Sequence, residues 1–530
     1  MTGLKTLVTV SLSALMLAAC GGSIKAGGAL SPEKASGKSD SKGHAVSKAA
    51  AANFDSALDS FADHDKKQDW DDTSCTAIAK QFEQAADAQK SDTGRPFPEA
   101  LYNAGLAYQR CGKDAEAKDK FQAASSADAG FHRARAQLAL YDYAKTNDLD
   151  GAIDKLEGVI RDAKFQNVEA LVSVAALQME RQSDQSTQDG KNDLERALRN
   201  LQRALAIDDG YMPASNQLAI YYLEQAKAKA GQADKSGKRG RRGMEVSGAS
   251  KIDVDKQQLD LASLVASQAQ KKNPNYAPIS NTIGLIQVQL KNFNNAVKSF
   301  GRARQLDPKF FEAQMNYAAV NLSFRGFEEA EKAYREALKL HPNEYEAQLG
   351  LALALRGEIN DSNFDKNVDE AQQHLDQAKK IAPDRAETYY NEAILTQEYR
   401  SKRGNAVPML EKAAQQYKTF IDKAGSDSGL AQAVKRSKDR MQDIQDTVKF
   451  IKEGDEADKA AQKEAAAAKE AAKNAPPPPP DAAAGGDAKG GDAKGGDAKG
   501  GDAKGGDDDS KAGDAKAPDA KAPDAKPAKK

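Results

Sequence analysis

The 530-residue chain is poor in the residues that build a compact core. It contains one Trp, aromatic residues make up 6% of it, and its mean hydropathy is −0.71. At the same time, its length exceeds what a single hydrophobic core usually holds. The composition therefore favours a long, thin, alanine-rich helical protein with disordered ends over a compact enzyme.

An excess of charge of one sign is also missing, since 77 Lys and Arg residues oppose 78 Asp and Glu residues. This balance gives no reason to expect nucleic acid or an acidic substrate as a partner. The chain has no HExxH, paired CxxC or GxSxG motif, and its five histidines are scattered singly. We therefore expect no enzymatic activity, no cofactor and no metal site.

Long apolar runs are absent, because none reaches the roughly 20 residues that a transmembrane helix needs. The apolar run Leu7–Leu17 follows Lys5 and has the length of a secretory signal core. It ends in Leu17-Ala18-Ala19-Cys20, and two glycines come next. The sequence predicts a signal peptide over residues 1–19.

The segment Leu17–Cys20 resembles the bacterial lipobox, in which the cysteine sulfur receives a diacylglycerol and the chain is cut before the cysteine. The alternative is an ordinary signal peptide with a chance cysteine. The resemblance implies several acyl chains on Cys20, which anchor a protein more stably than one chain does. Gly21 implies sorting to the outer membrane, with the protein facing the periplasm. Residues 20–46, rich in Gly, Ser, Lys and Ala, predict a flexible tether.

Cysteine is scarce as well, and two residues remain once Cys20 is lipidated, Cys75 and Cys111. In an oxidising periplasm these two can form a disulfide. The alternative is a pair of small buried residues at helix contacts. The sequence alone leaves both open, because pairing depends on the distance between the Cβ atoms.

What the chain does have is internal repetition. Three segments start 34 residues apart, at Ala277, Phe311 and Tyr345, and a similar one starts at Pro98. Small residues recur at the eighth, twentieth and twenty-seventh positions, and a large aromatic residue recurs at the twenty-fourth. The eighth position holds Gly105, Gly284, Ala318 and Ala352. This pattern resembles the tetratricopeptide repeat, a pair of antiparallel helices that must stack on neighbours to bury its apolar face.

Weaker units fill the gaps, and the total is nine, give or take one. The resemblance implies an all-α fold, a right-handed superhelix over residues 47–452 that ends in an amphipathic capping helix from Leu430 to Lys452. An exposed Ala/Lys/Glu helix is predicted over residues 453–475. A tail over residues 476–530 begins with five consecutive prolines and continues with GGDAK and APDAK repeats, and we expect it to be disordered.

In this repeat family, partners usually bind a concave groove lined by the first helix of each pair. The resemblance places the fifth, sixth and ninth positions of a repeat in that groove. The candidate partner-binding residues are therefore Tyr102, Asn216, Asn281, Leu285, Met315, Asn316 and Tyr390. The alternative for the asparagines is that they only solvate a helix face.

A basic insertion over about residues 228–254 separates the two helices of one repeat. Its charges are Lys235, Lys238, Arg239, Arg241 and Arg242. One hypothesis is an electrostatic contact with peptidoglycan, anionic lipid or an acidic partner. The other is a plain surface loop, because long insertions cost little stability.

The chain combines a lipobox, a divergent first helix pair that contains Asp-Trp and a cysteine, a repeat array and a charged tail. In this combination it resembles the outer-membrane lipoproteins of the myxobacterial gliding machinery (GltE type). The resemblance covers about residues 1–452, without the basic insertion and the tail. It implies a non-enzymatic scaffold that gathers envelope proteins into one complex. The alternatives are a pilotin-like lipoprotein, an outer-membrane assembly lipoprotein, and an adaptor that recruits cell-wall hydrolases.

Overall fold

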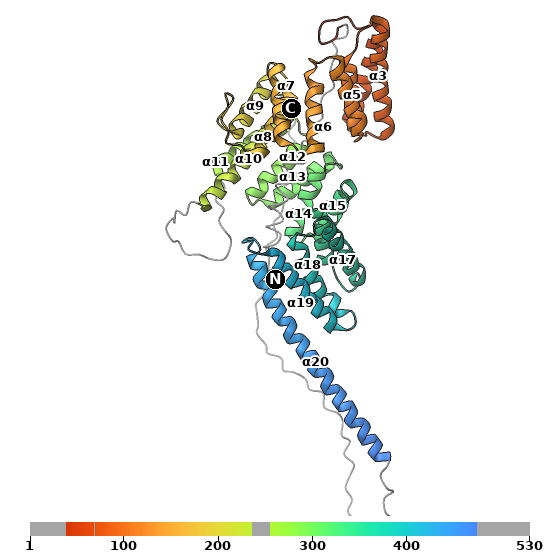
Figure 1. The fold of residues 1–530 in the computed structure, drawn as a ribbon, viewed down its shortest axis with the longest axis vertical. Helices are drawn as coiled ribbons and strands as arrows, with labels where there is room; N and C mark the ends of the chain where they lie inside the picture. Colours follow the sequence, from red (N-terminus) through yellow and green to blue (C-terminus); the bar gives the residue numbers. More distant parts are fainter. Residues whose placement is uncertain (1–38, 68, 236–254, 474–530) are drawn as a thin grey trace, which may run out of the picture. The chain divides into compact units, whose positions relative to one another are not determined.

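The computed structural model describes residues 39–67, 69–235 and 255–473 (Figure 1). In these ranges the secondary structure is helical apart from two isolated β-bridges. None of the helices described is both long and apolar enough to cross a bilayer. Outside the described residues lie the signal peptide, Cys20, most of the tether, Lys238, Arg239, Arg241, Arg242 and the tail, and the side chain of Lys235 is not described either.

The described helices form nine consecutive pairs followed by one long helix, which confirms the predicted all-α repeat architecture (Figure 1). The first helices of the pairs are α2 (Lys48–Lys67), α4 (Pro98–Arg110), α6 (His132–Thr146), α8 (Val168–Arg181), α10 (Met212–Lys235), α12 (Ala277–Gln289), α14 (Phe311–Ser323), α16 (Tyr345–Gly357) and α18 (Ala386–Glu398). The second helices are α3 (Asp72–Thr93), α5 (Asp114–Ala127), α7 (Leu149–Asp162), α9 (Asp193–Ile207), α11 (Lys256–Lys272), α13 (Phe293–Leu306), α15 (Phe327–Leu340), α17 (Phe364–Ile381) and α19 (Ala406–Ala424).

Close packing within a pair depends on the small residue at the eighth position of the repeat. A Cβ atom added to Gly105 would lie 2.7 Å from the ring of Phe121, and at Gly284 it would overlap the ring of Phe300 even more closely. Both rings are fully buried. The aromatic residue predicted to fill the space beside the small residue therefore does so.

Replacing Gly284 with alanine should destabilise the protein by about 2 kcal/mol, because the added methyl group overpacks the contact with Phe300. Denaturant unfolding followed by circular dichroism measures the change. The matched control is Gly158→Ala in α7, where the added Cβ meets no atom within 4 Å and the helix gains propensity. Equal stability of the two variants would contradict the packing argument.

The hydrophobic core is shared between neighbouring pairs. One buried cluster draws its residues from α14, α15, α16 and α17 and also includes Leu395 of α18. Another combines α2, α3, α4 and α5 and reaches Ala134 of α6. No pair in these clusters buries its apolar surface alone, as expected for stacked repeats.

The last helix, α20 (Ala431–Lys473), runs without a break through residues 452 and 453, where the sequence analysis separated a capping helix from an Ala/Lys/Glu helix. Ile444 and Val448 pack into the cluster formed with α18 and α19. From Lys452 to Glu470 every residue is exposed. The chain divides into two compact units after Ala457.

Candidate interaction surface

The first helices of three successive pairs, α10, α12 and α14, are joined by side-chain hydrogen bonds between asparagine and threonine residues. Thr282 Oγ1 of α12 donates to Asn216 Oδ1 of α10 over 2.7 Å. Asn316 Nδ2 of α14 donates to Asn281 Oδ1 of α12 over 3.0 Å. Asn281 and Asn316 are each 6% exposed, so the two amides contact each other instead of solvating a helix face. These contacts fix how one pair sits beside the next.

Four other residues predicted for the groove lie in the core. Tyr102 is fully buried, and its ring centroid lies 5.4 Å from that of Phe121. Tyr390 is buried in the same way, 5.0 Å from Phe420. The two remaining residues, Leu285 and Met315, are also buried. The structure thus places these side chains between helices rather than on an open face, because large apolar groups at the fifth and ninth positions fill the space between neighbouring pairs.

Arg356, on the first helix α16, is a buried cation that was not predicted from the sequence. It is the twelfth residue of α16, and its guanidinium donates to Asn391 Oδ1 over 3.1 Å. The residue is 9% exposed, and burial lowers the pKa of its guanidinium from the usual value. The signal in the sequence is a single arginine at the end of the apolar run LGLALALR.

A second regular feature is a glutamate at the second residue of five first helices. These first-turn glutamates are Glu99, Glu169, Glu312, Glu346 and Glu387. Carboxylates are favourable at a helix N-terminus because the backbone N–H groups and the helix dipole stabilise negative charge. The row therefore places acidic groups at corresponding positions of α4, α8, α14, α16 and α18.

The neighbours of the first-turn glutamates differ along the row. Glu169 is held by the guanidinium of Arg133, the second residue of α6. Arg385 donates to Glu346 over 3.1 Å. Burial raises the pKa of Glu346 even though Arg385 opposes it, and burial raises the pKa of Glu312 as well. Because burial disfavours the charged form of Glu312 and Glu346, a cation beside either carboxylate would stabilise it.

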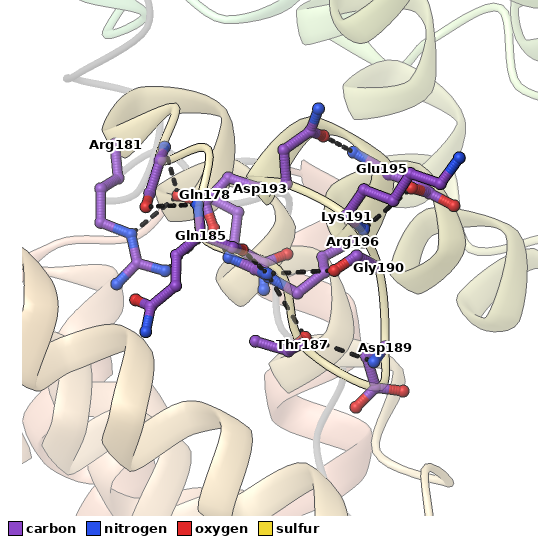
Figure 2. A network of polar contacts seen from close by, with 12 residues as sticks. Gln178, Arg181, Gln185, Thr187, Asp189, Gly190, Lys191, Asp193, Glu195 and Arg196 are labelled. Carbon is purple, nitrogen blue, oxygen red and sulfur yellow. Dashed lines mark hydrogen bonds and ion pairs between the residues drawn. The ribbon is translucent and has the colours of Figure 1, made fainter.

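Between α8 and α9 a polar insertion is organised around buried charges (Figure 2). Asp193, the first residue of α9, is fully buried and accepts hydrogen bonds from Arg181 Nε over 2.7 Å and from Ser183 N–H over 2.8 Å. It also contacts the guanidinium of Arg196. Burial raises the pKa of Asp193, but the hydrogen bonds from these three groups outweigh it, and the pKa lies below its usual value.

Arg196 connects the carboxylate of Asp193 to the loop that precedes α9. The side chain is 3% exposed and donates to the backbone oxygen of Gln185 over 2.8 Å and to Thr187 Oγ1 over 3.3 Å (Figure 2). On the outer side, Arg199 donates to the backbone oxygen of Asp189 over 2.8 Å. The insertion is therefore tied to α9 at several points along its length.

Cys75 and Cys111 are paired as a disulfide, and their Cα atoms lie 6.3 Å apart. The bond joins the first turn of α3 to the end of α4, and so links the first helix pair to the second. The carboxylate of Asp72 lies within 4.8 Å of both sulfur atoms. These three groups could offer ligands to a metal only with both sulfurs reduced, because a disulfide has no thiolate to donate.

Glu358, at the end of α16, carries a carboxyl group whose pKa is raised to about 7 by burial and by the nearby carboxylate of Glu331. The folded state therefore binds a proton that the unfolded state releases near pH 4.5. The associated stability is present at low pH and is lost as the pH rises from about 4.5 through 7.

Glu358→Gln should consequently stabilise the protein by about 1 kcal/mol at pH 8, a value reduced for the partial exposure of the group, and have little effect at pH 5. Denaturant unfolding at the two pH values measures this difference. Asp361→Asn, an exposed position nearby, is the control and should change neither value. A gain that is the same at pH 5 and pH 8 would rule out the titration of Glu358 as its cause.

Comparison with known families now identifies one unit of the array. Residues 277–310, which contain α12 and α13, match the family model described as Tetratricopeptide repeat. Residues 277–310 are a tetratricopeptide repeat. The pairs α14–α15 and α16–α17 start 34 and 68 residues after it, so they continue the tetratricopeptide spacing.

Solved structures similar to parts of the chain include two that are described as tetratricopeptide repeat proteins and a third, pilF. TTC0263 of Thermus thermophilus is 23% identical, with a TM-score of 0.33 over 42% of this chain and 99% of that one. A protein from Parabacteroides merdae ATCC 43184 is 15% identical, with a TM-score of 0.33 over 58% and 98%. Pseudomonas aeruginosa pilF is 17% identical, with a TM-score of 0.32 over 48% and 97%. No curated protein matches the chain. Because these TM-scores are low, the assignment depends on residues 277–310 and on the repeat spacing.

Proposed function

We propose that this protein is a non-enzymatic scaffold that gathers protein partners along its tetratricopeptide repeats. The observation that carries the proposal is the stack of nine helix pairs, in which side-chain contacts such as Asn281–Asn316 join the first helices α10, α12 and α14. Repeats that contact only their neighbours form long surfaces suited to holding other proteins. Three of the first-turn glutamates, Glu312, Glu346 and Glu387, are half-buried and add acidic groups to such a surface.

We further propose that the scaffold is anchored in the outer membrane by acyl chains on Cys20 and faces the periplasm. The lipobox-like segment Leu17–Cys20 supports the anchor. The disulfide between Cys75 and Cys111 supports an oxidising compartment, since stable disulfides are rare in the cytosol. The basic insertion over residues 228–254 is a proposed contact with peptidoglycan or anionic lipid.

Cys20→Ala should remove the anchor, so that the protein appears in the soluble periplasmic fraction or keeps its signal peptide. Fractionation of the envelope and mass spectrometry of the N-terminus measure this outcome. The wild-type chain should carry acyl groups on Cys20. A variant that still fractionates with the outer membrane would contradict lipid anchoring.

The complex that this scaffold serves is proposed to be an envelope-spanning machine of the gliding-motility type. Affinity capture from detergent-solubilised envelopes tests this directly. Enrichment of gliding-motility proteins supports the proposal. Enrichment of a secretin favours a pilotin-like role, barrel-assembly proteins favour an assembly role, and hydrolases or muropeptides favour a cell-wall adaptor; each of these would overturn the motility assignment.

A further inference from the structure

The chain's own segment Ser39–Ser47 lies against the first two helix pairs as a compact turn. Ser39 and Ala45 form an isolated antiparallel bridge. Inside this turn, the carboxylate of Asp40 accepts the backbone N–H of His44 over 2.7 Å. The segment therefore has a defined shape before its contacts with the helices are considered.

One end of the segment contacts α4 and the C-terminal end of α5. The backbone N–H of Ser41 donates to Glu99 Oε1 over 2.7 Å. Lys42 Nζ forms an ion pair with Asp128 over 2.8 Å, and the Asp128 side chain is only 11% exposed. The repeats thus hold this end through one main-chain hydrogen bond and one basic side chain.

The other end is held by a single glutamine of α3. Gln89 Oε1 accepts the backbone N–H of Ser47 over 2.7 Å, and Gln89 Nε2 donates to the backbone oxygen of Ala45 over 3.1 Å. Gln89 is 1% exposed. An amide that pairs with both a donor and an acceptor of a peptide backbone recognises the chain without regard to its side chains.

Glu99 is left incompletely satisfied by this arrangement. It is fully buried, and its second carboxylate oxygen, Oε2, has no hydrogen-bond partner within the described ranges. A buried carboxylate that lacks partners is costly. The segment supplies one N–H group to a side chain that can accept several hydrogen bonds.

The repeats themselves show what completes such a site. Glu169 occupies the same position of α8 as Glu99 does of α4, and it is held by Arg133, the second residue of the preceding first helix, α6. The corresponding residue of α2, which precedes α4, is Ala49. Within the described ranges, Glu99 therefore has no counterpart of the guanidinium that holds Glu169.

From these observations we propose that the surface formed by Gln89, Glu99 and Asp128 is a binding site for an extended peptide that carries an arginine. Segment 39–47 occupies this site within the same molecule as a displaceable plug. A partner peptide would reproduce the main-chain hydrogen bonds to Gln89 and Glu99 and would place its guanidinium on Glu99.

Hydrogen–deuterium exchange of the full chain, read by mass spectrometry on the fragment covering residues 39–47, tests the proposal in two steps. In the first step, Gln89→Ala should speed exchange of this fragment about tenfold, because both hydrogen bonds to Gln89 are lost. Gln84→Ala, an exposed position on the same helix, is the control and should leave exchange unchanged.

In the second step, a synthetic peptide of residues 39–48 carrying S41R is added at about 1 mM, a concentration comparable to that of a tethered segment. Exchange of fragment 39–47 should accelerate in the wild-type chain and stay slow in Glu99→Gln, whose amide still accepts the Ser41 N–H but carries no charge.

Unchanged exchange in Gln89→Ala would overturn the docking. A peptide effect that is absent, or equal in Glu99→Gln, would overturn the arginine site. Protection that rises with protein concentration would assign the segment to a second copy of the chain.

Discussion

Replacing Asp193 with alanine should lower the free energy of unfolding by about 4 kcal/mol. The carboxylate is fully buried and is held by Arg181, Ser183 and Arg196. Its removal leaves the guanidinium of Arg196, which is 3% exposed, without its anionic partner. An unpaired buried charge costs far more than the pair itself contributes. Equilibrium denaturation of the variant measures the loss.

Two further variants separate the charge effect from simple loss of contacts. The double variant Asp193→Leu with Arg196→Met replaces the pair by apolar groups of similar size and should recover most of the stability. Asp189→Ala removes a half-exposed acid of the same loop, which contacts Arg203 over 3.2 Å, and should cost less than about 1 kcal/mol. If the double variant is as unstable as Asp193→Ala, the buried charge is not the cause.

The double substitution Cys75→Ala and Cys111→Ala should lower the free energy of unfolding of the first two helix pairs by about 3 kcal/mol. The disulfide closes a loop between residues 36 positions apart and ties α3 to α4. Its loss frees the unfolded chain and so favours unfolding. Thermal unfolding with and without a reductant, followed by the fluorescence of Trp70, reports on this part of the chain because Trp70 packs against Phe61.

The reductant itself needs a control. It should lower the melting temperature of the wild-type chain and leave that of the double variant unchanged, because no other pair of cysteines is left to reduce. A wild-type chain that melts at the same temperature in oxidising and reducing conditions would contradict a stabilising disulfide.

The repeat architecture could be predicted from the sequence because its signals are local. The small residue at Gly284 and the ring at Phe300 are separated by a fixed number of residues, and the structure brings them into contact. Nine pairs were predicted and nine are present in the described ranges. A fixed spacing that recurs along a chain thus predicts both the helices and the way in which they pair.

The candidate surface could be predicted less well, because a position in a repeat does not reveal what the next pair covers. Asn281 and Asn316 lie on the expected helices, but each is used to contact the other. Tyr102 faces neighbours from α5 and the turn before α6, which only the stacked structure brings together. In a stacked array, residues of a neighbouring pair determine whether a side chain is buried or exposed. The sequence of a single repeat therefore does not predict that burial.

The features that the sequence analysis missed depend on segments distant in the chain. Glu99 is an ordinary first-turn residue until the turn at Ser41, 58 residues earlier, covers it. Asp193 and Arg196 lie three residues apart on the buried face of α9, beside Ala197, Leu201 and Ala204, and two opposite charges on a buried helix face are unusual. That local contrast is a signal that could have indicated the buried pair.

The sharing of the core between neighbours has a consequence for how such a chain changes its length. Each internal pair presents an apolar face on both sides, so a copy inserted between two existing pairs meets compatible surfaces at both ends. Truncation of the chain at a repeat boundary instead exposes the apolar surface of the last remaining pair, which favours aggregation. Gene duplication in the middle of the array therefore conserves solubility, whereas truncation from either end does not, and engineered shorter versions need α20 grafted onto their last pair.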